Sequence, residues 1–139
     1  MKAVFDTNIV MDVVLDRKPF SRPATRLFAL SEKGVLQGTL CATTLTTIHS
    51  LAGKELGKDR AHSIVGTLIS LFEILPVTRA VVESAWLLDW EDFEDGVLHE
   101  AARHAGVEIL VTRDVKGFSK SMLSVFSPDQ LLSMTDSLE

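Results

Sequence analysis

The stretch FDTN at residues 5–8 decides how this chain folds, because it joins an apolar run to the first acidic side chain. Two later stretches are also acidic, DFED at residues 92–95 and VTRD at residues 111–114. An apolar run that predicts a buried strand precedes the first stretch and leads into the third, so Asp6 and Asp114 are expected at strand ends. Ligands bind at the carboxyl ends of the strands in an open parallel α/β sheet. We therefore expect these carboxylates to meet at one edge of a sheet.

Carboxylates gathered in this way repel one another, and they do not all ionise readily unless a cation compensates their charge. Their hard oxygen atoms suit Mg²⁺ or Mn²⁺. The sequence therefore predicts a metal site.

The spacing of apolar residues alternates between the periods of strands and helices. It predicts strands at residues 3–5, 36–42, 72–75, 109–112 and 124–126. It predicts helices at residues 21–33, 45–56, 61–69, 81–88, 93–105 and 128–134. Strands that alternate with helices of this length favour a parallel sheet covered by helices on both faces.

The composition is that of an ordinary globular protein. The 139 residues are 46% hydrophobic and 24% charged, which fits a single domain spanning residues 1–139. The net charge of −5 argues against a protein that coats nucleic acid by bulk positive charge. Cys41 is the only cysteine, which excludes an internal disulfide and a cysteine-rich zinc site; we expect it to be a small buried apolar side chain.

The first residues resemble the start of a signal sequence, but Asp6 interrupts the apolar run and Asp12 follows soon after. No segment reaches the roughly 18 apolar residues of a membrane span. We therefore expect a soluble, cytoplasmic protein without a membrane partner.

Each acidic stretch also has a simpler explanation. Asp6 could cap a following helix, and Asp92 and Asp95 could cap or stabilise the start of another. Asp114 could be a turn residue. Capping alone does not require three separate segments to deliver carboxylates to the same sheet edge, which favours a functional site.

In order and spacing, these stretches resemble PIN-domain proteins, most closely the small bacterial toxins of toxin-antitoxin pairs. The resemblance rests on the strand followed by FDTN, on DFED before a helix of small residues, and on the strand ending in VTRD with Phe118 soon after, and it runs from residue 2 to about residue 132. It implies a three-layer α/β/α sandwich with a mostly parallel sheet of about five strands. It also implies a ribonuclease that depends on Mg²⁺ or Mn²⁺.

The resemblance assigns roles to individual residues by position. Metal binding and catalysis are implied for Asp6, Asp95 and Asp114. Supporting roles are implied for Asn8, which would help to hold the first aspartate, for Asp92 on the rim, and for Thr112, which would hydrogen-bond within the acidic cluster. If the site is competent, a metal-activated water would attack an RNA phosphodiester, and no nucleophilic side chain is needed.

One position departs from the family pattern. The helix after the second strand usually carries a glutamate where this chain has Thr47. A threonine supplies no negative charge, so we expect weaker metal binding than in a full cluster.

Other polar residues give weaker signals. His99 lies four residues after Asp95 and could face the cleft, but we favour a solvated or hydrogen-bonded surface histidine. Two basic groups could flank the acidic cleft and contact RNA phosphates. They are Arg17, Lys18, Arg22 and Arg26 after the first strand, and Arg113, Lys116 and Lys120 after the fourth.

Three functions remain open from the sequence. They are a metal-dependent ribonuclease, a PIN-fold module that binds RNA or protein without useful nuclease activity, and a different acidic α/β protein such as a haloacid-dehalogenase-type phosphatase or a receiver domain. The last fits poorly, because such a phosphatase should show Asp-x-Asp where this chain has Asp6-Thr7-Asn8. Apolar residues around Leu68 and Trp86 favour a homodimer, and the resemblance suggests an antitoxin partner.

Overall fold

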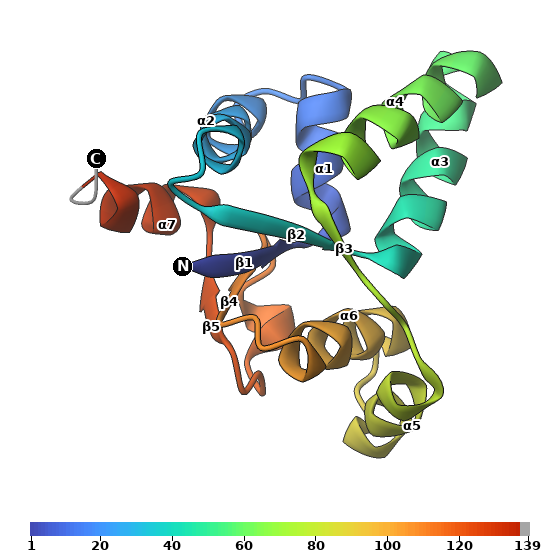
Figure 1. Ribbon diagram of the computed structural model, residues 1–139, viewed down its shortest axis with the longest axis vertical. Helices are drawn as coiled ribbons and strands as arrows, with labels where there is room; N and C mark the ends of the chain where they lie inside the picture. The colour runs from blue at the N-terminus through green and yellow to red at the C-terminus, as the bar shows by residue number, and fades with distance from the viewer. Residues whose placement is uncertain (137–139) are drawn as a thin grey trace.

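A computed structural model describes residues 1–136 of the chain. Five strands form one sheet in the order β3-β2-β1-β4-β5, and every neighbouring pair is parallel (Figure 1). The strands are β1 (Lys2–Phe5), β2 (Gln37–Cys41), β3 (Glu73–Leu75), β4 (Ile109–Val111) and β5 (Ser124–Phe126). The expected α/β/α architecture and parallel sheet are therefore confirmed.

Helices cover both faces of the sheet, as Figure 1 shows. One face carries α1 (Thr7–Val14), α2 (Ser21–Glu32), α3 (Ala42–Leu56), α4 (Lys58–Leu71) and α7 (Pro128–Thr135). The other face carries α5 (Arg79–Leu88), α6 (Phe93–His104) and the 3-10 turn η1 (Lys116–Phe118). Within residues 1–136, no helix has the length and apolar character needed to cross a membrane.

The alternation of side chains along β1 divides the core in two. Ala3 and Phe5 point into the cluster beneath α1 to α4, whereas Val4 points into the cluster against α5 and α6. Successive strand residues face opposite sides of a sheet, so a continuous apolar run is what a doubly covered strand requires. Cys41 is fully buried at the end of β2, as expected.

Helix α1 and turn η1 are the elements that apolar spacing did not predict. The apolar residues of α1 include the unbroken run Ile9-Val10-Met11, which does not show a helical period, and its valines are β-branched, which lowers helix propensity. The helix begins because the Asp6 side chain accepts a hydrogen bond from the Thr7 backbone. Asp6 therefore caps helix α1 and also lies at the end of β1, so the two roles that the sequence suggested for it are compatible.

The sheet reverses its winding beside β1. From β1 the chain proceeds to β2 and β3 on one side, while β4 and β5 lie on the other. Phe5 pairs with Val111, and the Asp6 backbone N–H donates to the Val111 carbonyl at 2.9 Å. The carboxyl ends of β1 and β4 therefore lie side by side at a topological switch point, where open α/β sheets bind ligands.

Candidate active site

Asp6 is the most firmly held carboxylate at this edge. It is only 8% exposed, its Oδ1 accepts from the Thr7 backbone N–H at 2.8 Å, and its Oδ2 accepts from the Thr112 hydroxyl at 2.8 Å. Burial raises the pKa of Asp6, and the hydrogen bonds from Thr112 and Thr7 oppose that rise. The two bonds fix the direction of the carboxylate without neutralising its charge.

Asp95 reaches the same edge from the first turn of α6. The helix is capped by Asp92, whose Oδ1 accepts from the Asp95 backbone N–H at 3.1 Å. Burial raises the pKa of Asp95 to about 7, and the negative charges of Asp6, Asp92, Glu94 and Asp114 add to the rise. Burial is the larger cause of the rise, and repulsion by the neighbouring carboxylates is the smaller one.

Asp114 is placed by the turn that follows β4. Its backbone N–H donates to the Thr112 hydroxyl at 3.0 Å, and its Oδ1 accepts from the Gly117 backbone N–H at 3.0 Å. A Cβ on Gly117 would collide with the Asp114 carboxylate, so a side chain at this position would force the carboxylate to move. The Thr112 hydroxyl thus links two acidic segments, since it also donates to Asp6.

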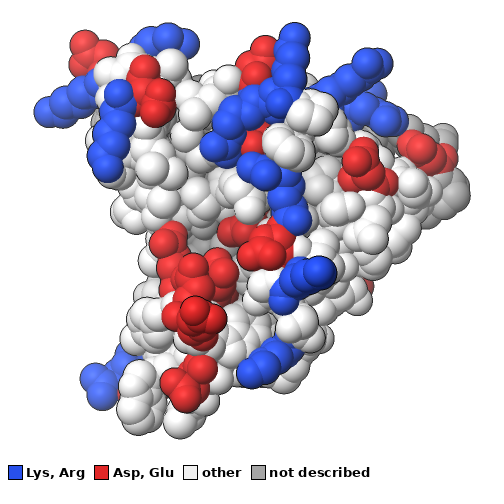
Figure 2. All heavy atoms as spheres, turned by 180° about the vertical axis from the view of Figure 1, so that it is seen from behind, with Lys and Arg blue, Asp and Glu red and all other residues white. Residues whose placement is uncertain are grey.

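The acidic residues surround one hollow in the surface. Figure 2 shows acidic side chains gathered there, with basic side chains on more than one side of them. The lining residues are Asp6, Thr7, Asn8, Met11, Arg17, Thr47, Leu51, Asp92, Glu94, Asp95, Leu98 and Asp114. We call this the acidic hollow. The structure therefore brings together the three aspartates implied as metal ligands, with Asn8 and Asp92.

Asn8 does not make the contact expected of it. In the described part of the chain, the hydrogen bonds to the Asp6 carboxylate come from Thr7 and Thr112. The side-chain oxygen Oδ1 of Asn8 is instead buried, and it has no hydrogen-bond partner among residues 1–136. A buried acceptor without a partner is costly unless something binds it.

Thr47 also lines the acidic hollow, and it contacts an acid that the sequence did not single out. The Thr47 hydroxyl donates to Glu94 Oε1 at 2.8 Å. Glu94 lies in α6, 47 residues from Thr47, so only the packing of α3 beside α6 reveals the pair. In the sequence, the only sign of a role for Glu94 was its position within the acidic DFED stretch.

The donor set suits a hard divalent cation. Clustered carboxylates, among them Asp6 and Asp95 with raised pKa values, and the buried amide oxygen of Asn8 are the ligand types that Mg²⁺ and Mn²⁺ take. As the side chains of residues 1–136 stand, however, no three Asp, Glu, His or Cys groups are arranged as a ready-made metal site. Binding would therefore require side-chain rotation, for which the exposed Asp92 and Asp114 have room.

Arg17 brings positive charge to the acidic hollow and is held by a second buried acid. Asp12 is fully buried in α1, and its carboxylate accepts from Arg17 Nε at 2.9 Å and from Arg113 Nε at 2.7 Å. The Arg113 guanidinium also lies 4.0 Å from the centre of the Phe20 ring. The sequence analysis gave Asp12 no role, although its position between the apolar residues Met11 and Val13 could have indicated a buried acid.

The interpretation of His99 as a surface residue is wrong. His99 is fully buried, with Nδ1 at 2.8 Å from Glu100 Oε2. Its Nε2 accepts from the Met122 backbone N–H at 3.1 Å, and burial lowers its pKa. Helical spacing alone could not distinguish the buried face of α6 from the cleft face, because the segment after η1 covers this side.

The two basic groups are distributed over different hollows. Arg17 lines the acidic hollow, whereas Lys18, Arg22 and Arg26 line another one beside α2. Lys116 and Lys120 line a hollow that adjoins the acidic one. Of the first group, only Arg17 therefore lines the acidic hollow.

Comparison with known proteins identifies the family. The model of the PIN domain matches residues 2–116, which is most of the chain. The chain belongs to the PIN-domain family. Ribonuclease VapC1 from Aquifex aeolicus (strain VF5) is 23% identical over 145 residues, covering 99% of this chain and 97% of that relative.

Two solved structures share the fold of this chain. A toxin-antitoxin complex from Klebsiella pneumoniae has a chain that is 25% identical, with a TM-score of 0.69 over 91% of this chain and 97% of that one. DNA-bound VapBC from Salmonella typhimurium has a chain with a TM-score of 0.73 at 19% identity, over 92% of this chain and 98% of that one. This PIN domain therefore resembles toxin-type members, as its sequence predicted.

Proposed function

We propose that this PIN domain is a metal-dependent endoribonuclease and the toxin of a toxin-antitoxin pair. The observation that carries the proposal is the convergence of Asp6, Asp95 and Asp114 on the acidic hollow, where the pKa of Asp95 rises to about 7. Family membership and the likeness to Ribonuclease VapC1 support RNA as the substrate.

Each residue has a part in this proposal. Asp6, Asp95 and Asp114 would hold Mg²⁺ or Mn²⁺, and the Asn8 side-chain oxygen and Asp92 would complete the set. Thr112 orients Asp6, and Arg17 provides a cation for an RNA phosphate near the cluster. When bound, the divalent ion supplies an acidified water and neutralises charge on the attacked phosphate.

The test combines a metal titration with an RNA cleavage assay. We expect cleavage to appear with Mg²⁺ or Mn²⁺ and to disappear when a chelator removes them, because in this proposal the attacking water depends on the ion for its acidity. Ca²⁺ at the same concentration is the control for non-specific charge effects. Cleavage that persists in excess chelator would contradict a metal-dependent mechanism.

A binding module without useful nuclease activity is the second candidate, and Thr47 favours it. A threonine stands where the family usually has glutamate, so the site lacks one anionic ligand at that position. Metal and RNA binding without cleavage in the same assay would support this candidate.

Thr47→Glu is expected to tighten metal binding by about tenfold or more and to increase cleavage, because it adds an anionic oxygen ligand. Without metal the new carboxylate would face Glu94, its hydrogen-bond partner at 2.8 Å in the native chain, so the melting temperature of the metal-free variant should fall. Calorimetric titration and thermal unfolding with and without metal measure both effects.

Thr46→Glu is the matched control, because it adds the same charge to the exposed neighbouring position of α3. The Thr47 explanation fails if the two variants bind metal equally, or if Thr47→Glu folds normally and leaves affinity and cleavage unchanged. The double variant Thr47→Glu, Asp6→Asn should lose the tighter metal binding and the increased cleavage of Thr47→Glu.

We also propose two protein partners and a location. The likeness to a chain of a solved toxin-antitoxin complex supports an antitoxin partner, and we propose that this partner covers the acidic hollow. Exposed apolar side chains on α5, including Trp86 and Leu87, support a homodimer. The proposed substrate favours the cytoplasm. Co-purification with the product of a neighbouring gene, sedimentation of the isolated chain and cell fractionation test these three points.

A further inference from the structure

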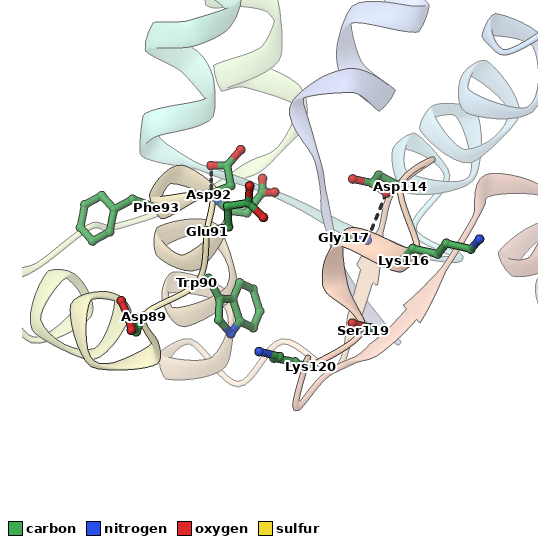
Figure 3. Close-up of a pocket in the computed structure, with 11 residues that line it drawn as sticks. Asp89, Trp90, Glu91, Asp92, Phe93, Asp114, Lys116, Gly117, Ser119 and Lys120 are labelled. Carbon is green, nitrogen blue, oxygen red and sulfur yellow. Dashed lines mark hydrogen bonds between the residues drawn. The ribbon is translucent and has the colours of Figure 1, made fainter.

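A second hollow opens beside the acidic one and shares its rim. It has a volume of about 700 Å³, and Asp92, Asp95 and Asp114 line both hollows. Its remaining lining residues are Asp89, Trp90, Glu91, Phe93, Lys116, Gly117, Ser119 and Lys120 (Figure 3). We call it the Trp90 hollow.

The indole ring of Trp90 packs against two buried rings. Its centre lies 4.7 Å from that of the His99 ring and 5.9 Å from that of Phe118. His99 is itself held by Glu100 and by the Met122 backbone. Trp90 is only half-buried, so the rest of its ring surface lines the hollow and offers a rigid aromatic platform.

Two lysines belong to the wall of the hollow that faces Trp90. In Figure 3, this wall is formed by η1 and the residues after it; Lys120 points toward the Trp90 side, whereas Lys116 extends away from Trp90 along the rim. Among residues 1–136, neither ammonium group forms an ion pair with a carboxylate. Both are therefore available to a phosphate backbone that passes along the rim.

The Trp90 hollow carries more negative than positive side chains, and this charge limits which ligands can enter it. Carboxylates of Asp89 and Glu91, together with the three shared with the acidic hollow, outnumber the two lysines. A phosphate deep in the hollow would be repelled, whereas a neutral ring bearing N–H groups could stack on Trp90 and donate to the carboxylates.

We propose that the Trp90 hollow binds one unpaired nucleobase of a single-stranded RNA, stacked on Trp90, while Lys116 and Lys120 contact the adjoining backbone. The inference rests on the proposed ribonuclease function, since the hollow lies next to the acidic cluster. A base inside a duplex cannot stack on a protein ring, so the RNA must be unpaired at this nucleotide. The hollow thus selects single-stranded substrate next to the phosphodiester at the acidic hollow.

Fluorescence of Trp90 tests this directly. The chain has two tryptophans, and Trp86→Phe leaves Trp90 as the only one; Trp86 is exposed on α5 and is not among the residues that line the hollow. With a chelator present, this variant is titrated with a short single-stranded RNA, with the same RNA annealed to its complement, and with an abasic ribose-phosphate strand. We expect saturable quenching by the single-stranded RNA alone.

A binding measurement with substitutions of Trp90 completes the test. Trp90→Leu should weaken binding of the single-stranded RNA by about 5- to 150-fold, the range for one base stacked on an aromatic ring. Trp90→Phe should retain most of the affinity, because a phenyl ring can still stack on a base. If Trp90→Leu does not fold, the fluorescence titration still decides the matter.

The outcomes separate this inference from the proposed function. Equal quenching by duplex or abasic strand, or no quenching by a protein that cleaves RNA, overturns the base site and leaves the ribonuclease standing. Quenching by single-stranded RNA in a protein that never cleaves supports the base site and contradicts the nuclease. Absence of both quenching and cleavage overturns both.

Discussion

Asp95→Asn is expected to abolish divalent-metal binding and RNA cleavage and, at the same time, to stabilise the metal-free protein above pH 7. The loss of activity should exceed the roughly 10- to 100-fold that removal of an outer-shell partner costs, because a proposed direct ligand is removed. Calorimetric metal titration and the cleavage assay measure this loss.

The stabilisation has a definite pH dependence. Asp95 has a pKa of about 7 in the folded chain against 3.8 for an ordinary aspartate side chain, so the folded state holds its proton more tightly. Below pH 3.8 the group is protonated in both states and costs nothing. As the pH rises toward 7 the unfolded state ionises first, so stability falls, and the full cost is present above about pH 7.

An asparagine never ionises, so the variant avoids this cost. Its melting temperature should match the native one near pH 4 and exceed it by about 2 to 4 °C at pH 8, as roughly 1 kcal/mol would produce. Solvent screening at this partly exposed side chain keeps the expected gain small.

Two substitutions serve as controls for Asp95→Asn. Glu108→Gln removes one negative charge from an exposed position just before β4, at the opposite edge of the sheet, and should change neither activity nor the pH profile. Asp6→Asn should also abolish metal binding, but with less gain in stability, because Asp6 accepts bonds from Thr7 and Thr112. Undiminished metal binding in both Asp6→Asn and Asp95→Asn would contradict the assignment of the site.

The largest loss of stability is expected when both arginines are removed from Asp12. The double variant Arg17→Ala, Arg113→Ala leaves a fully buried carboxylate without either of its cations, which typically costs about 3 to 5 kcal/mol. Each single variant should cost much less, because the other guanidinium remains. Urea unfolding monitored by circular dichroism measures these differences.

A charge-matched variant distinguishes this effect from a general change in net charge. Arg26→Ala, Arg79→Ala removes two arginines from exposed ion pairs with Asp136 and Glu83, and each pair should contribute at most about 1 kcal/mol. Adding Asp12→Ala to the first double variant should recover part of the lost stability, since the unpaired charge is gone. Equal stability of the two double variants would show that Asp12 does not depend on its arginines.

The sequence by itself determined most of the helices and strands and the edge of the sheet where the acids lie. Apolar runs before Asp6 and Thr112 could become strands with both faces covered, and local periodicity required helices between them. Because parallel strands end at a common edge, the positions of Asp6 and Asp114 followed from these patterns. The same reasoning did not find α1, whose apolar run has no helical period and whose start depends on the side chain of Asp6.

Only the tertiary structure decided which side chains meet across that edge. Asp12 and Arg113 are 101 residues apart, Thr47 and Glu94 are 47 apart, and the burial of His99 depends on a segment that follows η1. Local patterns specify which face of an element is apolar, because that face must leave water whatever it packs against. They do not specify the register and rotation with which elements pack, and hydrogen bonds of about 3 Å depend on both.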